Sequence, residues 1–161
     1  RGAVSVRSMA DVVVHRPDPA LLNGADLDLW VACTWDTRPA RGLFDRCDWR
    51  LDGLLERWLR AGRIELAPGA RCLVGASRRL GGARLLVVGL GSPEAREAVT
   101  PSLARSLAEQ ARSLGAKRPA LEVPRGLDEA AARRFVERGW KREAPGDAVH
   151  IIRSEPGEAA A

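Results

Sequence analysis

The sequence lacks the cysteine and histidine spacings that metal sites require. Its three cysteines, Cys33, Cys47 and Cys72, contain no C-x-x-C pair, and each lies in an apolar pattern. We therefore expect three buried, reduced thiols in a cytoplasmic protein. The two histidines, His15 and His150, lie near opposite ends of the chain, and we expect each to be isolated from a second ligand. The sequence thus predicts neither a metal nor a cofactor.

Common catalytic motifs are also missing. No serine lies in a G-x-S-x-G turn, and the chain contains neither H-E-x-x-H nor a G-x-x-x-x-G-K-S/T loop. Because both histidines lie near the termini, no pair of nucleophile and base can be assembled from the sequence. We therefore expect that this chain alone is not an enzyme.

Long apolar runs are absent as well. No run approaches the length that crosses a bilayer, and no basic segment followed by an apolar stretch marks a secretory signal. We therefore expect a cytoplasmic protein with no membrane partner. Hydrophobic residues make up 45% and charged residues 29% of the 161 residues, which is typical of one globular domain. We interpret residues 1–9 as a disordered or vector-derived segment, residues 10–153 as a single domain and residues 154–161 as a frayed tail.

The most informative stretch that is present is an apolar run over residues 84–91, which ends in Gly-Leu-Gly. A short apolar run bounded by turn residues predicts a strand buried on both faces, and therefore helices on both sides of a sheet. The turn that follows a central strand is the usual ligand position in open α/β sheets. Gly89, Gly91 and Ser92 are therefore the candidate ligand-binding residues. The third glycine of a dinucleotide motif is absent and Glu94 would repel an anion, so a tight, closely packed turn is the alternative.

Hydrophobic patterns predict strands and helices along the whole chain. A short glycine-rich link favours an antiparallel hairpin between the third and fourth strands. Thr100 is the predicted N-cap of the second helix, and Gly139 is predicted to end the third. The predicted strands cover residues 11–15, 27–35, 71–76, 83–88, 119–123 and 147–153, and the predicted helices cover residues 42–61, 101–114 and 127–138.

The helix over residues 42–61 carries an apolar stripe at spacings of three and four residues. Trp58 belongs to this stripe, which we expect to pack on the strand over residues 85–88. Trp49 lies off the stripe, beside a charged face. No intramolecular role for a tryptophan is visible there, so we expect Trp49 to be partly exposed or covered by a partner. The stripe consists of Phe44, Cys47, Leu51, Leu54, Leu55 and Trp58.

The chain is basic, with a net charge of +5 and a pI of about 10.0. Basic proteins attract phosphates, so nucleic acid is a possible partner. The positive charge is almost entirely arginine and is spread along the chain, which compositional bias also explains. One local concentration free of carboxylates lies within residues 66–93, and its arginines form the candidate basic patch: Arg71, Arg78, Arg79 and Arg84.

The ordered set of these patterns resembles the N-terminal domain of the cytosolic leucyl aminopeptidase family. The resemblance covers about residues 10–153 and implies a macro-domain-like fold, a three-layer α/β/α sandwich with a mixed, mostly parallel sheet. In that family, a separate C-terminal domain holds two catalytic metal ions within a signature like Asn-Thr-Asp-Ala-Glu-Gly-Arg. That signature is absent here, so no catalytic residue can be assigned. The segments that carry the resemblance are residues 25–29, 47–55, 61–62, 84–91, 114–117 and 120–124.

The resemblance and the residues together leave three functions open. The favoured one is a non-catalytic interaction or assembly domain, since the family's N-terminal domain makes subunit contacts. Such a domain would be part of a metallo-aminopeptidase if a catalytic domain followed it. The second is a basic nucleic-acid-binding module, because some bacterial members bind DNA. The third is a macro-like pocket for ADP-ribose or another nucleotide at the turn over residues 89–92.

Overall fold

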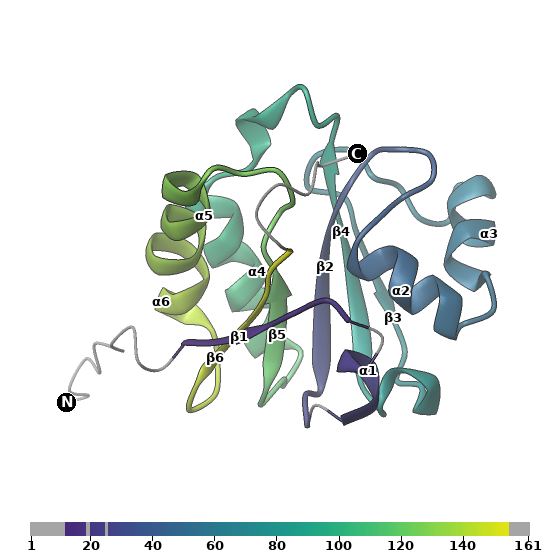
Figure 1. Ribbon diagram of the computed structural model, residues 1–161, viewed down its shortest axis with the longest axis horizontal. Coiled ribbons are helices and arrows are strands. Elements are labelled where there is room, and N and C mark those ends of the chain that lie inside the picture. Colours follow the sequence, from purple (N-terminus) through teal and green to yellow (C-terminus); the bar gives the residue numbers. More distant parts are fainter. Residues whose placement is uncertain (1–11, 19, 25, 155–161) are drawn as a thin grey trace.

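The computed structural model describes residues 12–18, 20–24 and 26–154, and it shows a single six-stranded sheet between two layers of helices (Figure 1). The predictions for residues 1–9 and 155–161 lie outside the described residues. The strand order is β1-β6-β5-β2-β4-β3, and all pairs are parallel except β3–β4. The mixed, mostly parallel α/β sandwich is therefore confirmed. The strands are β1 (Val12–His15), β2 (Leu29–Trp35), β3 (Arg71–Val74), β4 (Arg84–Gly91), β5 (Pro119–Glu122) and β6 (Val149–Ile152).

The apolar run over residues 84–91 is β4, and it is buried on both faces as predicted. Leu86 and Val88 face one hydrophobic core, whereas Leu85 and Val87 face the other. Its parallel neighbour β2 is buried at all seven positions and lies between β4 and β5 inside the sheet. The predicted antiparallel hairpin with β3 is also confirmed, with β3 at the sheet edge.

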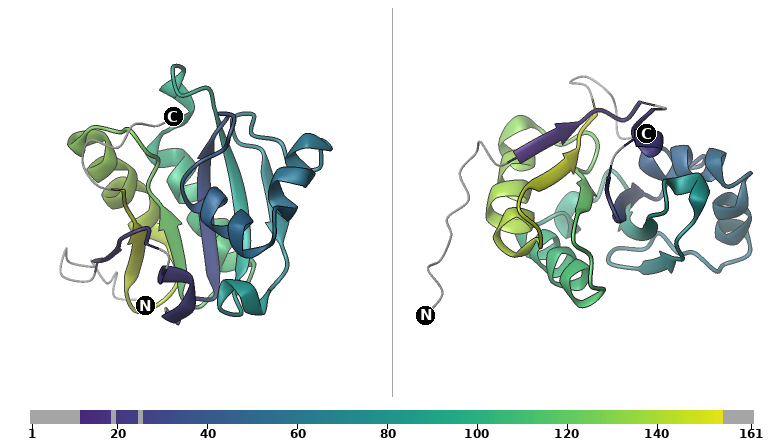
Figure 2. Two further views of the ribbon diagram at one scale, coloured as in Figure 1. Left: turned by 45° about the vertical axis from the view of Figure 1, so that its right-hand side comes forward. Right: turned by 90° about the horizontal axis from the view of Figure 1, so that it is seen from below.

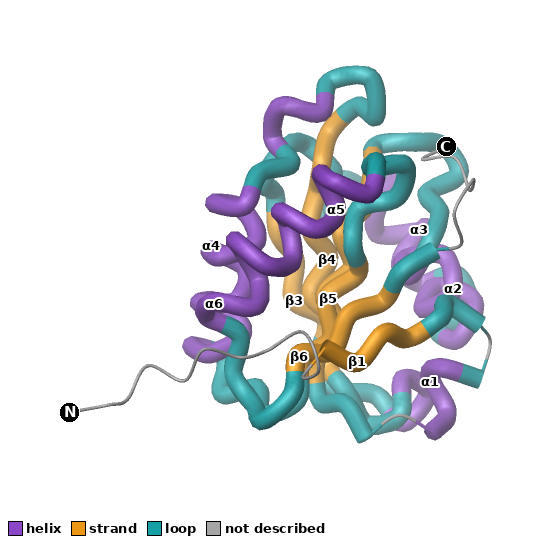
Figure 3. The backbone as a smooth tube through the Cα atoms, turned by 60° about the vertical axis from the view of Figure 1, so that its left-hand side comes forward, coloured by secondary structure: helices purple, strands orange, loops and turns teal. Residues whose placement is uncertain are grey.

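One helical layer contains α4 (Pro101–Ser113), α5 (Glu129–Phe135) and α6 (Lys141–Glu143), and the other contains α1 (Leu21–Gly24), α2 (Leu43–Arg50) and α3 (Leu54–Arg60). Figures 2 and 3 show these two groups on opposite sides of the strands. The predicted cap of α4 is confirmed, since the side chain of Thr100 accepts a 3.1 Å hydrogen bond from the amide of Leu103. Short 3₁₀ turns lie at Arg78–Leu80 and Arg96–Ala98.

The single helix predicted over residues 42–61 is wrong, because the chain breaks it into α2 and α3. The break lies at Asp52 and Gly53, which have φ angles of 54° and 79°. Such left-handed backbone is incompatible with a continuing helix, and glycine adopts it at little cost. The carboxylate of Asp48 then accepts a 3.0 Å hydrogen bond from the amide of Glu56, which ties the two helices together. As a result, Leu59 is buried and Trp58 is only half-buried.

The helix predicted over residues 127–138 also differs, because Gly139 does not end it. The helix begins at α5, where Asp128 caps the amide of Ala131 at 2.7 Å. It then continues through a π-helical turn, Val136–Trp140, into α6. A Cβ atom at Gly139 would lie 2.4 Å from the Cβ of Ala104 in α4. The glycine is therefore needed for the close approach of two helices rather than for a cap.

Candidate functional site

The predicted ligand site after β4 is filled by the chain itself. The amide of Gly89 donates to the carbonyl of Ala70 at 2.8 Å, and the amide of Gly91 donates to that of Leu66 at 2.9 Å. A Cβ at Gly89 would lie 2.3 Å from the carbonyl oxygen of Ala67, so residues 66–70 pack directly on this strand end. The two amides that would hold a phosphate are thus already hydrogen-bonded. Close packing accounts for both glycines, and ligand binding here remains a prediction.

The third residue of that site, Ser92, is exposed and contacts an acidic neighbour. Its hydroxyl donates a hydrogen bond to the carboxylate of Glu94. This bond, more than any other contact, lowers the pKa of Glu94 below its ordinary value. Glu94 is therefore ionised at neutral pH beside the turn, where it would repel an anionic ligand.

The four arginines of the candidate basic patch are not brought together on one face. Arg71 reaches Gln110 at 2.5 Å and Ser106 at 2.7 Å, both on α4. Arg84 donates to the carbonyl of Leu114, just after α4, at 2.8 Å. On the opposite side of the sheet, Arg79 forms an ion pair with Asp52, between α2 and α3, and Arg78 is exposed on the 3₁₀ turn beside it. These residues therefore form no continuous surface for a phosphate backbone.

A buried carboxyl group that the sequence analysis did not single out fixes the start of α2. Glu122, at the carboxyl end of β5, is only 3% exposed. Its Oε2 accepts a 2.7 Å hydrogen bond from the amide of Leu43, and its Oε1 has no partner among the described residues. A Cβ at Gly42 would lie 2.5 Å from Oε2, so glycine allows this contact. In the sequence, the sign of this role is one acidic residue at the end of an otherwise apolar predicted strand.

Burial controls the protonation of this carboxyl group. It raises the pKa of Glu122 to about 8, although the bond from Leu43 and the charges of Arg125 and Arg46 oppose the shift. Glu122 is therefore mainly neutral at pH 7. A neutral group can be buried without a paired charge, and it still accepts the hydrogen bond that holds the first turn of α2.

A groove lies between α1 and α2 in this helical layer. It has a volume of about 300 Å³ and is lined by Asp18, Leu22, Asp45, Arg46, Trp49 and Arg50. Four of these residues lie on α2, at spacings of three and four that place them on one helix face. Leu22 comes from α1, and Asp18 comes from the segment before it.

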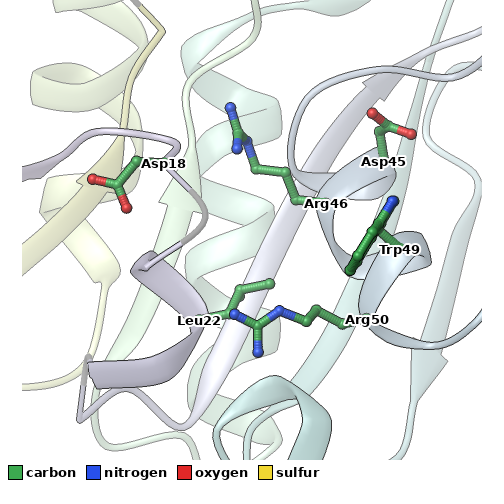
Figure 4. Close-up of a pocket in the computed structure, with 6 residues that line it drawn as sticks. All are labelled: Asp18, Leu22, Asp45, Arg46, Trp49 and Arg50. Carbon is green, nitrogen blue, oxygen red and sulfur yellow. The ribbon is translucent and has the colours of Figure 1, made fainter.

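The groove combines an exposed aromatic ring with charges of both signs. Trp49 is 82% exposed, as its position off the buried stripe predicts, whereas Leu22 is buried. In Figure 4, Arg50 extends from α2 toward Leu22 on α1 and Arg46 points upward from the same side of α2, whereas Asp45 and Trp49 lie at the right of the view. The groove residues include no serine, cysteine, histidine or lysine. Their chemistry suits stacking, ion pairing and apolar contact rather than covalent catalysis.

The expectation of two isolated histidines is wrong. His15 on β1 and His150 on the adjacent β6 share a 3.0 Å hydrogen bond between Nε2 and Nδ1. Their planes differ by 24° and their centroids lie 5.3 Å apart, which is the separation of two rings that meet end to end across such a bond. Burial is the main cause that lowers the pKa of each histidine. The charge of His15 lowers the pKa of His150 further, and Arg118 makes a smaller contribution to both. The two residues are 135 positions apart, so sequence spacing conceals the pair.

The described residues contain no group of three or more histidine, cysteine and acidic side chains placed to hold a metal ion. All three cysteines are free; Cys33 and Cys47 are buried as predicted, and Cys72 is half-buried. Burial raises the pKa of each thiol. Within the described part of the chain, no helix has the length and apolar character needed to cross a membrane.

A second hollow, of about 770 Å³, lies at the amino ends of β5 and β6, with His150 in its wall. Carboxylates already bind the guanidinium group and two backbone amides beside it. Arg118 pairs with Asp26 at 2.7 Å, and the carboxylate of Asp28 accepts the amides of Lys117 and Arg118 at 2.7 and 2.9 Å. The residues around this hollow thus tie the strand starts together.

Comparison with known proteins shows likeness at the level of the fold. The macrodomain of Thermus aquaticus DarG matches with a TM-score of 0.59 and 14% identity, over 90% of this chain and 99% of that one. The macrodomain of Mycobacterium tuberculosis DarG matches with a TM-score of 0.55 and 16% identity, over the same shares of the two chains. A mutant of tomato leucine aminopeptidase matches with a TM-score of 0.53 and 17% identity, over 93% of this chain and 33% of that one.

No family model matches the sequence, and no curated protein matches it either. The chain is therefore macro-domain-like in fold, and the resemblance to the N-terminal domain of leucyl aminopeptidases is confirmed at that level. The chain corresponds to about a third of the tomato enzyme.

Proposed function

We propose that this chain is a non-catalytic interaction domain that contacts a protein partner through the groove between α1 and α2. The observation that carries the proposal is Trp49, which is 82% exposed on a helix whose other face is buried. Exposed tryptophan side chains on a folded surface are costly to hydrate, and tryptophan is enriched at the centres of protein interfaces. Partner binding gives this side chain a role that the isolated fold does not.

The position of α2 in the fold also suits binding. Phe44 and Cys47 anchor its inner face in the core, and Glu122 holds its first turn. Trp49 is therefore presented from a rigid element rather than from a loop. A preorganised surface loses little conformational entropy on binding, so more of the contact energy appears as affinity.

The proposal includes the absence of peptidase activity in this chain. The groove residues offer no pair of nucleophile and base, and the sequence lacks the two-metal signature of the aminopeptidases that the fold resembles. Purified protein is assayed on leucine p-nitroanilide with added manganese or zinc. We expect no turnover above the metal-only background. Metal-dependent turnover that persists through further purification would overturn this part of the proposal.

The test of the interaction compares partner capture by wild type and by Trp49→Ala. Leu73→Ala is the matched control, because Leu73 is an exposed apolar residue, 44% exposed, on the edge strand β3 and does not line the groove. We expect a protein, or a second copy of the chain, to bind wild type and Leu73→Ala but not Trp49→Ala. If no binding of any protein depends on Trp49, the proposal is wrong.

A nucleotide such as ADP-ribose is the second candidate ligand, supported by the likeness to macrodomains and by the chemistry of the groove. A base can stack on the indole of Trp49 while Arg46 and Arg50 contact phosphate groups. Calorimetry with ADP-ribose on wild type and on Trp49→Ala separates the candidates. Saturable heat that disappears in the variant supports a nucleotide in the groove, and heat that persists places it elsewhere.

A further inference from the structure

We infer that a second surface of this protein binds the phosphate backbone of a nucleic-acid duplex. The surface lies on the continuous helix over residues 129–143, which consists of α5, the π-helical turn and α6. This helix belongs to the layer opposite to the one that carries the Trp49 groove, so the inference is independent of the proposed function (Figure 1). The centre of the surface is an arginine row, which consists of Arg134, Arg138 and Arg142.

The arginine row lies on the side of this helix that faces away from the core. Buried residues recur along the inner side, from Ala132 through Phe135 to Trp140, whereas all three arginines are exposed. The arginines are four residues apart, which places them on one face of the helix. A π-helical turn takes more residues than the 3.6 of an α-helical turn, so positions four apart line up more closely here than along a regular helix. The arginine row is therefore nearly straight.

The charges of the arginine row are not neutralised by the described part of the chain. None of its three arginines forms an ion pair with a described residue. Arg133 and Lys141 lie beside the row on the same helix, and neither of them forms such a pair either. The helix thus presents five basic groups that are available to an anionic partner.

The acidic residues of the same helix compensate little for this charge. Glu129 pairs with Arg153, which follows β6, at 2.7 Å. Glu143 pairs with Arg112 on α4 at 3.1 Å. The third acidic residue, Glu137, is half-buried. The outer face of the helix therefore carries a local excess of positive charge, which attracts polyanions.

The composition of this surface favours a duplex over other polyanions. Protein interfaces have aromatic or apolar residues at their centre, and helices that bind membrane surfaces have an apolar face. None of the exposed large apolar side chains among the described residues lies on this helix. Single strands stack their bases on aromatic side chains, but Phe135 and Trp140 are buried. Duplex phosphates need only cationic hydrogen-bond donors, and the planar guanidinium group of arginine suits them.

The experiment measures the affinity for a short fluorescent DNA duplex of mixed sequence by anisotropy, over a range of salt concentrations. We expect wild type to bind at low salt, with an affinity that falls steeply as salt rises. The test variant combines Arg134→Gln, Arg138→Gln and Arg142→Gln. Because it loses three phosphate contacts, we expect at least about tenfold weaker binding at low salt. The slope of log K against log salt should become shallower by about 2.7.

The matched control combines Arg41→Gln, Arg63→Gln and Arg78→Gln. These three arginines are exposed on the other side of the sheet, beside α2, beside α3 and in the 3₁₀ turn, so the net charge changes by the same amount. The control variant should keep a slope within about one of the wild-type value. Trp49→Ala should bind the duplex as wild type does. Circular dichroism and urea melts establish that every variant is folded.

Three results would overturn the inference. The first is a wild type that does not bind the duplex at low salt. The second is equal weakening of the test variant and the matched control, because net charge rather than the arginine row would then be responsible. The third is binding to vesicles of phosphatidylcholine and phosphatidylserine in place of the duplex, which would assign the surface to a membrane. Each of them would leave the proposed function standing, since Trp49-dependent capture uses the other helical layer.

Discussion

At the scale of single residues, Glu122 links the end of β5 to the start of α2. Its carboxyl group is buried and neutral, and it accepts a hydrogen bond from Leu43, 79 positions earlier. The residue therefore has a structural role that the sequence analysis missed. An apolar strand with one acidic residue at its carboxyl end is the only local signal, and the partner amide can be identified only from the fold.

The raised pKa of Glu122 predicts a definite dependence of stability on pH. Between the ordinary carboxyl pKa of 4.5 and about 8, the unfolded chain is ionised while the folded chain keeps the proton. Its contribution is therefore fully present below pH 4.5 and is lost as the pH rises toward 8, at up to about 1.4 kcal/mol per pH unit. We expect Glu122→Gln to remove this slope in urea unfolding experiments. An unchanged slope would mean that Glu122 is ionised in the folded protein.

The histidine pair predicts a slope of the opposite sign. Because the pKa values of His15 and His150 are lowered from 6.5 in the fold, the unfolded chain binds protons more tightly. This contribution is present above pH 6.5 and is lost as the pH falls below it. We expect His15→Gln to reduce the loss of folding stability below pH 6.5. Both proteins are measured by urea unfolding in a Glu122→Gln background, so that the slope from the carboxyl group does not mask the effect. If the stability falls equally with and without His15, the histidine pair does not cause this pH dependence.

At the scale of elements, the sequence predicts the strands better than the helices. The strand β4 is recognisable because its apolar run is bounded by glycines and is long enough to be buried on both faces. The break between α2 and α3 was missed because the apolar stripe continues across it. The Asp52-Gly53 dipeptide is a turn signal that could have located the break. At Gly139 the error was the opposite one, since a helix end was predicted where the helix continues. A glycine required for close packing cannot be distinguished in the sequence from a glycine that ends a helix.

The end of β4 gives a prediction about packing. A Cβ at Gly89 would lie 2.3 Å from the carbonyl oxygen of Ala67, a backbone atom that cannot move aside easily. We expect Gly89→Ala to lower the free energy of unfolding by about 2 kcal/mol or more, as overpacking does. Gly75→Ala is the control, since nothing lies within 4 Å of its Cβ position. Thermal or urea melts of the two variants measure the difference; equal melts would show that residues 66–70 do not pack on the strand.

At the scale of the whole molecule, the hydrophobic segments predicted a layered α/β fold, and the resemblance to the leucyl aminopeptidase N-terminal domain implied its macro-domain-like type. The candidate site was predicted only in part. Trp49 could be identified because its neighbours on the helix are charged, but the groove beside it could not, since Leu22 comes from a different element. Nothing in the sequence indicated that residues 66–70 would pack against the glycine turn and bind its amides. Contacts between distant segments decide both cases.

The central claim is that Trp49 serves binding rather than folding, and the free energy of unfolding of Trp49→Ala tests it most directly. Urea unfolding is measured at low protein concentration, with Trp140→Ala as the control because Trp140 is fully buried. We predict that Trp49→Ala unfolds within about 0.5 kcal/mol of wild type, as surface substitutions do. Trp140→Ala should lose about 3–5 kcal/mol. A loss for Trp49→Ala as large as that for Trp140→Ala would show that Trp49 belongs to the core, and would contradict the account.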